Sequence, residues 1–254
     1  MELQNYFASK KELYQLILDF LDCSEDDEGN SYSNLYSHIQ KEKLIENKIE
    51  LRSFIRLIMI ISNNHHREQN FYKKIEKIFL SIKDSTKQTN SISEIFDLFY
   101  SNKRILLFAF QQNFLPINDT TFSLLLNKNK KIEKNQIKHG TIELYSMIEQ
   151  LQIKQSKQNY LYYFYPEFQS FFSREQREEI QENLREFTIE NSEEFNEKRE
   201  KGENDSNICS LIRNDSIIEF ITLINQINYP LTSQIESSIF ETNEFLFDKK
   251  PSLI

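Results

Sequence analysis

Hydrophobic residues recur along most of this chain at intervals of three or four positions, which is the spacing of one face of an α-helix. The clearest example lies between residues 205 and 227, where a short polar interval separates two such runs. The apolar positions are Ile208, Leu211 and Ile212 in the first run and Ile217, Phe220, Ile221 and Ile224 in the second. The pattern predicts a short helix, a tight turn and a second short helix.

Residues that favour helix N-caps precede both runs, with Asp205 and Ser206 before the first and Asp215 and Ser216 before the second. Helices this short are marginal alone, because nucleation is costly and each buries a single stripe. We therefore expect neighbouring helices on both sides, as in a helical repeat array. The residues predicted to form the interface between repeats are Ile208, Leu211, Ile212, Phe220, Ile221 and Ile224.

The same periodicity predicts helices through the first half of the chain. They cover residues 10–23 after Ser9, 33–46, 51–61 and 70–87, with an acidic loop at 25–30. Residues 93–114 then repeat the helix–turn–helix design. At an offset of 113 residues, from 95 to 208, Ile95, Leu98, Phe99, Ile105 and Phe108 align with Ile208, Leu211, Ile212, Ile218 and Ile221. The polar turns 101–102 and 214–215 also align, which indicates a weak internal repeat.

The second half of the chain predicts shorter and more charged helices. The predicted elements are a helix capped by Asn118 or Asp119 and ending near Leu126, a polar connection over 127–138, an amphipathic helix over 141–155, and charged helices over 174–187 and 192–201. The aromatic run 160–165 is expected to stop at Pro166, because the residue before a proline disfavours helical geometry. Ser173 and Gln176 are spaced as a capping box, and Gly202 is expected to end the last charged helix.

No alternation of polar and apolar residues is long enough to predict a strand. We therefore predict an all-α chain of stacked antiparallel helix pairs, similar to an α-solenoid. The predicted regions are helix pairs over 1–127, a charged helical connection over 128–201, and a helix pair with the start of a truncated next repeat over 202–254.

Composition and charge narrow the function classes. Three Gly and four Pro in the chain disfavour turn-rich all-β folds and leave no glycine-rich phosphate loop. A net charge of −8 and a pI near 5.2 disfavour a general attraction to nucleic acid or anionic membranes. No apolar run of about 18 residues occurs, so no membrane span is expected. Cys23 and Cys209 lack a disulfide or metal-binding pattern, which favours a reducing, cytoplasmic environment.

Candidate reactive residues have simpler structural interpretations. His65 and His66 are adjacent, so on a helix they point about 100° apart and do not form a ligand pair. A helix C-terminus, where His interacts well with exposed carbonyls, is the favoured interpretation. Cys209 is interpreted as a small buried hydrophobe.

Three clusters could have a binding or catalytic role. The lysines at 128–138 lack the interleaved aromatics of a nucleic-acid site, so a solvated loop is favoured. The aromatic run 160–165 could stack on a ligand, although packing at a helix end is favoured. The pairs Glu178-Glu179 and Glu193-Glu194 lack the desolvation that general acids need. The sequence therefore assigns no catalytic, cofactor-binding or metal-binding residue.

Five stretches carry a family resemblance. They are ISNNHHR at 61–67, SNKRILLF at 101–108, KREKGENDSNICSLIR at 198–213, SIFETN at 238–243 and PSLI at 251–254. Together they resemble the N-terminal helical domain of unknown function that precedes ankyrin repeats in large families of protist ankyrin-repeat proteins. The resemblance implies an ankyrin-like helix pair at the C-terminal end and no catalytic residues to carry over. PSLI is similar to the start of the Thr-Pro-Leu-His signature of an ankyrin repeat.

The chain departs from that family by stopping at PSLI, so we expect an uncovered hydrophobic surface on the last helix pair. The predicted function is a non-catalytic protein–protein interaction or scaffolding module, with protein partners, downstream ankyrin repeats in a longer chain, and no cofactor. The alternative is a structural N-terminal cap of the ankyrin array with no partner of its own. A metal-dependent or hydrolytic enzyme is the least favoured class.

Overall fold

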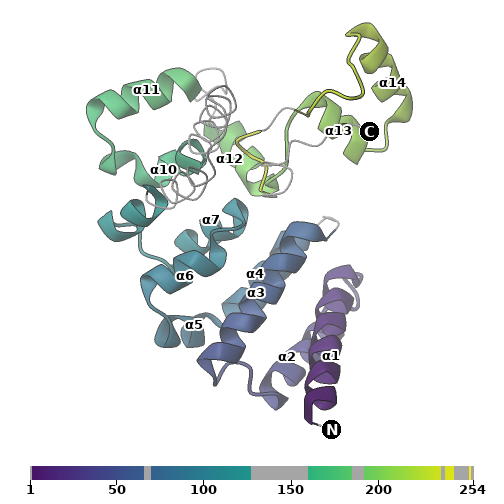
Figure 1. Ribbon diagram of the computed structural model, residues 1–254, viewed down its shortest axis with the longest axis vertical. Helices are drawn as coiled ribbons and strands as arrows, with labels where there is room; N and C mark the ends of the chain where they lie inside the picture. The colour runs from purple at the N-terminus through teal and green to yellow at the C-terminus, as the bar shows by residue number, and fades with distance from the viewer. Residues whose placement is uncertain are drawn as a thin grey trace, which may run out of the picture. The chain divides into compact units, whose positions relative to one another are not determined.

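The structure is a computed structural model that describes residues 2–65, 70–126, 160–184, 192–235, 238–242 and 252. Every regular element within these ranges is a helix, which confirms the all-α prediction (Figure 1). The one extended pairing in the described residues is an isolated antiparallel bridge between Gln234 and Ser252. None of the described helices is long and apolar enough to cross a membrane.

The chain forms two compact units. Unit 1 comprises Met1–Tyr100 and Gln111–Leu115, and unit 2 comprises Ser101–Phe110 and Pro116–Ile254. The stacking of antiparallel helix pairs, and the three-region division, stay predictions.

Unit 1 contains the six helices nearest the N-terminus. They are α1 (Glu2–Asp22), α2 (Glu28–Lys41), α3 (Lys48–Asn64), α4 (Phe71–Ser81), α5 (Lys83–Thr89) and α6 (Ile92–Phe99). Helix α1 contacts α2 and α4, and α3 contacts α6. The fully buried side chains include Ile17, Phe20, Leu35, Leu51, Ile55, Ile75, Phe79 and Phe99. These residues lie on the apolar faces that the periodicity predicts, so burial of those faces accounts for the core.

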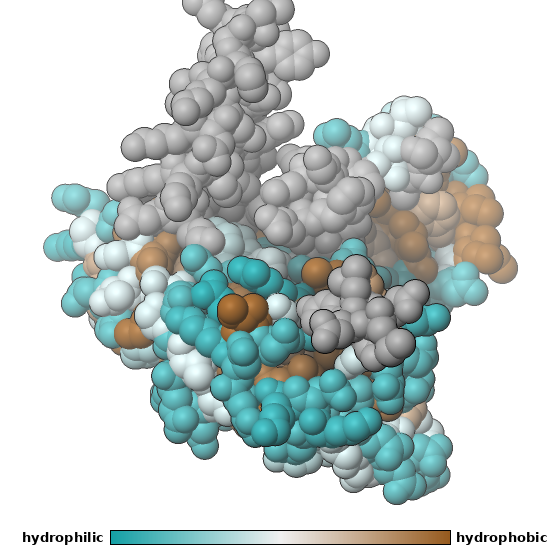
Figure 2. Space-filling model, turned by 60° about the horizontal axis from the view of Figure 1, so that its bottom comes forward, coloured by the Kyte–Doolittle hydropathy of each residue, from teal (hydrophilic) through white to brown (hydrophobic). Residues whose placement is uncertain are grey.

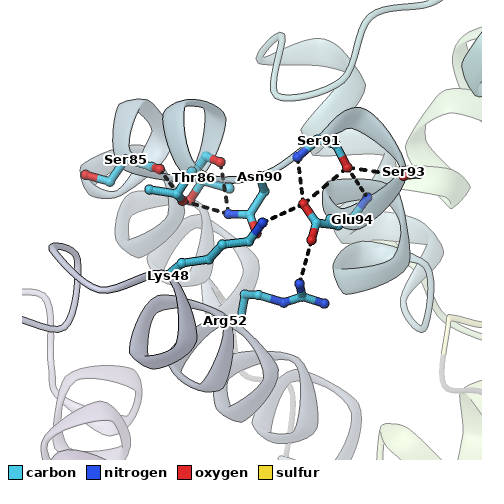
Figure 3. A network of polar contacts seen from close by, with 9 residues as sticks. Lys48, Arg52, Ser85, Thr86, Asn90, Ser91, Ser93 and Glu94 are labelled. Carbon is cyan, nitrogen blue, oxygen red and sulfur yellow. Dashed lines mark hydrogen bonds and ion pairs between the residues drawn. The ribbon is translucent and has the colours of Figure 1, made fainter.

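A polar network joins the start of α3 to the start of α6 (Figure 3). Glu94 is the N3 residue of a capping box, and its Oε2 accepts hydrogen bonds from the Ser91 N–H at 2.9 Å and from Lys48 Nζ at 2.9 Å. Its Oε1 accepts one from Arg52 Nη1 at 2.8 Å. The bond from the Ser91 backbone, followed by the bond from Lys48, lowers the pKa of Glu94 to about 2.

The remaining described elements belong mostly to unit 2. They are α7 (Lys103–Gln111), helical residues 119–126, α10 (Tyr165–Phe168), a 3₁₀ helix η1 (Gln169–Phe171), α11 (Arg174–Leu184), α12 (Ser192–Lys201), α13 (Asn207–Arg213) and α14 (Ile217–Gln226). An aromatic cluster forms the core near α10. Phe110 makes edge contacts with Phe164 and Phe168 at centroid distances of 5.8 and 5.3 Å, and Phe122 packs against Phe168 and Phe172.

Several predicted helix boundaries in unit 1 are wrong. Helix α1 begins at Glu2, before the predicted start after Ser9, and α2 ends at Lys41, before the predicted end at residue 46. Helix α2 begins at Glu28, inside the predicted acidic loop, because an acidic residue in the first turn interacts favourably with the helix dipole. The predicted helix over 70–87 is two helices, α4 and α5, separated at Ile82, whose ψ is 8°. The Ser81 hydroxyl donates to the Ile78 carbonyl at 2.7 Å, an alternative to the regular helical bonding at this break.

The aromatic run also differs from the prediction. It is helical to Tyr163, turns at Phe164, and continues into α10, where Pro166 occupies the first turn. Proline fits a first turn because its missing N–H would have no partner in the helix there. The predicted capping box is confirmed, since the Gln176 N–H donates to Ser173 Oγ at 3.2 Å and the Ser173 N–H donates to Gln176 Oε1 at 2.9 Å.

Candidate interaction surface

Helices α13 and α14 form the predicted helix–turn–helix. Ser206 caps α13 as predicted, with its Oγ accepting from the Cys209 N–H at 3.4 Å. Ser216 precedes α14 but makes no side-chain cap bond, so this half of the cap prediction is wrong. Asp215 instead adopts a left-handed conformation with φ of 52° that reverses the chain between the two helices.

The six residues predicted as the repeat interface are brought onto this helix pair, and none of them is buried. Ile208, Leu211, Phe220 and Ile224 are half-buried, whereas Ile212 and Ile221 are exposed. Whether these residues contact another repeat stays a prediction. The interpretation of Cys209 as a small buried hydrophobe is wrong. Cys209 is only half-buried, because it lies on α13, a helix with no buried residue.

The uncovered hydrophobic surface expected at this end is present. We define the apolar face by four residues, Ile212, Ile217, Ile218 and Ile221, whose exposed fractions are 49%, 60%, 78% and 53%. Hydrophobic residues gather where α14 lies, on the right of the view in Figure 2. The most exposed of them, Ile218, was absent from the predicted interface. Its alignment with Ile105 in the internal repeat was the signal that could have identified it.

A buried polar junction lies at the base of this helix pair. We define it by three stretches, 102–104, 199–205 and 238–242, which all belong to unit 2. They overlap the segments SNKRILLF, KREKGENDSNICSLIR and SIFETN that carry the family resemblance. The side chains of Asn102, Lys103, Arg199, Asn204, Glu241 and Thr242 are all at most 6% exposed. The sequence analysis did not identify this junction.

The C-terminal turn of α12 is the centre of the polar junction. The last carbonyls of a helix have no partner within it, so a buried helix end needs outside donors. Tyr163 Oη donates to the Arg199 carbonyl at 2.9 Å, and Arg104 Nε donates to the Glu200 carbonyl at 3.0 Å. Gly202, with φ of 65°, ends the helix as predicted.

The buried charges of the junction are engaged within the fold. Lys103 Nζ donates to the Ile239 carbonyl at 2.7 Å and lies 5.3 Å from the centre of the Tyr163 ring. Arg199 Nη2 pairs with Glu167 Oε2 at 2.6 Å, with both side chains largely buried. Removing one partner of such a pair leaves an uncompensated charge, which makes these contacts strong determinants of this packing.

The other candidates of the sequence analysis have structural positions. His65 follows the last residue of α3, as predicted, and its Nε2 lies 3.3 Å from Asp22 Oδ1. Tyr163 and Phe164 of the aromatic run are fully buried, which confirms packing over ligand stacking for these two residues. His66, the lysine cluster at 128–138 and the predicted helix at 141–155 lie outside the described residues. Among the residues that are described, no group of three or more His, Cys, Asp or Glu is arranged to hold a metal ion.

The fold and this surface define an all-helical protein with an open helix pair. Comparison with protein-family models, with curated proteins and with solved structures gives no significant match for this chain.

Proposed function

We propose that this chain is a non-catalytic protein–protein interaction or scaffolding module of an ankyrin-repeat protein, built from stacked antiparallel helix pairs. The observation that carries the proposal is the apolar face of α13 and α14, where four isoleucines on two short helices are each about half exposed or more. A cluster of exposed apolar side chains of this kind is typical of a contact surface.

A structural cap of an ankyrin array is the second candidate, and one observation favours it. The bridge between Gln234 and Ser252 returns the chain to the loop that follows α14. A helix pair that followed Ser252 would continue from the loop after α14, as the next repeat of an array does. In this reading the face would contact only the next repeat of its own chain.

The non-catalytic part of the proposal is supported by the polar junction. Its buried cations, Lys103 and Arg199, bond to a backbone carbonyl and to a carboxylate of the same unit. Such pairing favours a structural role for both residues. We further propose an intracellular location, because two cysteines 186 positions apart, Cys23 and Cys209, form no disulfide framework in the sequence.

Hydrogen exchange on two proteins tests the proposal. The first is this chain, and the second is this chain with two consensus ankyrin repeats fused after Ile254. If α13 and α14 stack on a following repeat, amides of residues 207–226 gain protection of at least about 100-fold in the fusion. The variant Ile218→Glu/Ile221→Glu is the matched control and should gain none. Unchanged protection in the fusion would exclude stacking on ankyrin repeats.

The same double variant separates the two candidates. An interaction module should capture a partner from the source cell with the unfused wild-type chain. A cap should capture no protein with either the unfused chain or the fusion. A partner that binds the unfused chain and is lost with Ile218→Glu/Ile221→Glu would locate binding on the apolar face itself.

A further inference from the structure

The segment 238–242 is a short non-helical stretch whose contacts resemble those of a bound peptide. Phe240 is its fully buried anchor. The Phe240 ring meets the Phe195 ring edge-on at a centroid distance of 5.4 Å, and Lys198 Nζ lies 5.7 Å from its centre. Both of these contacts, one aromatic and one cationic, come from α12.

The backbone of this segment is held at two points. Lys103 Nζ donates to the Ile239 carbonyl at 2.7 Å, and the Thr242 N–H donates to the Gly202 carbonyl at 3.2 Å. Between these points the Glu241 N–H donates to the Ser238 carbonyl at 3.3 Å, so the segment is a turn whose backbone is held whatever its side chains. The two points lie on either side of Phe240, so they fix the direction in which a peptide would lie.

Three side chains of the segment add selectivity. Ser238 Oγ donates to Asp205 Oδ1 at 2.7 Å, Thr242 Oγ1 donates to the Gly202 carbonyl at 2.8 Å, and Glu241 Oε2 accepts from the Asn204 N–H at 3.2 Å. Ser238, Glu241 and Thr242 are all buried. A replacement that cannot make these bonds would leave a buried polar group unpaired, which disfavours other sequences.

Gly202 sets the shape of the surface that receives Thr242. A Cβ atom at Gly202 would lie 3.0 Å from Thr242 Cγ2, and the φ of 65° is one that other residues rarely adopt. Lys198 is held in place by Glu194 at 3.0 Å and Asp205 at 3.1 Å. Burial lowers the pKa of Lys198, but these two hydrogen bonds outweigh it and raise its pKa above the ordinary value. The residues around the segment are thus positioned by their own contacts as well as by the segment.

We propose that unit 2 contains a peptide-binding site, occupied in cis by residues 238–242, that accepts the same segment in trans from a second copy of this chain. The site consists of Lys103, Phe195, Lys198, Gly202, Asn204 and Asp205. Its ligand class is a peptide that forms a turn over residues 238–241, with a buried phenylalanine followed by a carboxylate and a threonine. This site is separate from the apolar face and independent of the function proposed for it.

A fluorescent peptide spanning residues 235–244 tests the site on full-length protein by fluorescence anisotropy. In the wild type the cis segment competes at an effective concentration on the order of millimolar, so the peptide binds weakly. In Phe240→Ala the cis segment loses its anchor, and the peptide should bind at least about tenfold more tightly than to the wild type. A peptide carrying the same Phe-to-Ala change is the control and should not gain affinity.

Two further variants keep the test decisive. Thr242→Val is the variant to use if Phe240→Ala does not fold. It retains the anchor and removes one hydroxyl bond, so it should also bind the peptide more tightly than the wild type. Phe240→Ala/Gly202→Val narrows the site and should lose binding. Equal peptide affinity for the wild type and for every folded variant would overturn the proposal. Mixed dimers of Phe240→Ala and Gly202→Val chains in sedimentation would support exchange between copies.

Discussion

Helices α6 and α7 carry the same apolar spacing as α13 and α14, and the two sets differ most in what covers them. Ile105 is 1% exposed, whereas its aligned residue Ile218 is 78% exposed. Phe99 and Phe108 are buried, whereas the aligned Ile212 and Ile221 are exposed. Periodicity therefore determines that a segment is helical, but burial depends on neighbours that the segment itself does not encode.

The N-terminal caps of the covered helices, α6 and α7, are also stronger than those of the open pair, α13 and α14. Helix α6 begins with a capping box whose glutamate also pairs with Lys48 and Arg52. Its aligned helix, α13, has the Ser206 cap alone. At the start of α7, Asn102 Oδ1 accepts from the Ile105 N–H at 3.1 Å, whereas the aligned α14 begins without a side-chain cap. The covered helices are thus stabilised by side-chain contacts at their N-terminal ends. The open pair has fewer such contacts and is stabilised mainly by the polar junction at its base.

The largest expected effect comes from an aspartate at the two aligned isoleucines. Ile105→Asp places a carboxylate without a partner in the core and should cost more than about 4 kcal/mol, enough to unfold a marginally stable unit. Ile218→Asp should change the free energy of unfolding by no more than about 0.5 kcal/mol. Urea unfolding followed by circular dichroism measures both. Similar losses in the two variants would show that Ile218 is covered.

Truncating the aligned residues Phe99 and Ile212 to alanine should give the next largest difference in the free energy of unfolding. Phe99 packs against Phe79 at 5.0 Å and Phe114 at 5.7 Å, so Phe99→Ala should cost about 3–5 kcal/mol. Ile212→Ala should cost less than about 1 kcal/mol, because the side chain is already half in water. Thermal unfolding of both variants measures the two losses of stability. A loss above about 1 kcal/mol for Ile212→Ala would contradict an open apolar face.

An alanine at Gly202 tests the base of the open pair. The new Cβ would lie against Thr242 at a left-handed backbone, so Gly202→Ala should cost about 1–3 kcal/mol. Gly29 is the matched control, because it lies within α2 with no atom near its Cβ position. Gly29→Ala should stabilise the chain by up to about 1 kcal/mol. Denaturant unfolding should show a lower free energy of unfolding for Gly202→Ala and a higher one for Gly29→Ala. An unchanged free energy of unfolding in Gly202→Ala would contradict this prediction.

The smallest effect concerns the reinforced start of α6. The pKa of Glu94 is about 2 in the fold, below the ordinary value of 4.5, so its contribution to stability is present above pH 4.5 and is lost as the pH falls towards 2. Glu94→Gln keeps a capping side chain but removes this dependence. Urea midpoints at pH 7, 4 and 3 should fall less steeply in Glu94→Gln than in the wild type. If the urea midpoints of the wild type and of Glu94→Gln fell equally with pH, Glu94 would not be the source of the pH dependence.

The sequence predicted the helices well because most apolar faces are regular, as in α1 and α3. It failed at Ile82 and Pro166, where a local hydrogen bond and a first-turn proline outweigh the periodicity. It could not predict that Lys103 is buried. Lysine is normally exposed, and its partner Ile239 lies 136 residues away in the chain. The stretches of the junction stood out only through the family resemblance.

Hydrogen exchange of the unmodified chain tests the central claim, that α13 and α14 are left open, most directly. The comparison is between backbone amides of α14 and those of α7 in the same sample. We expect α14 amides to exchange at least about 100-fold faster, because local opening there exposes little additional apolar surface. Equal protection of the two helices would contradict the account.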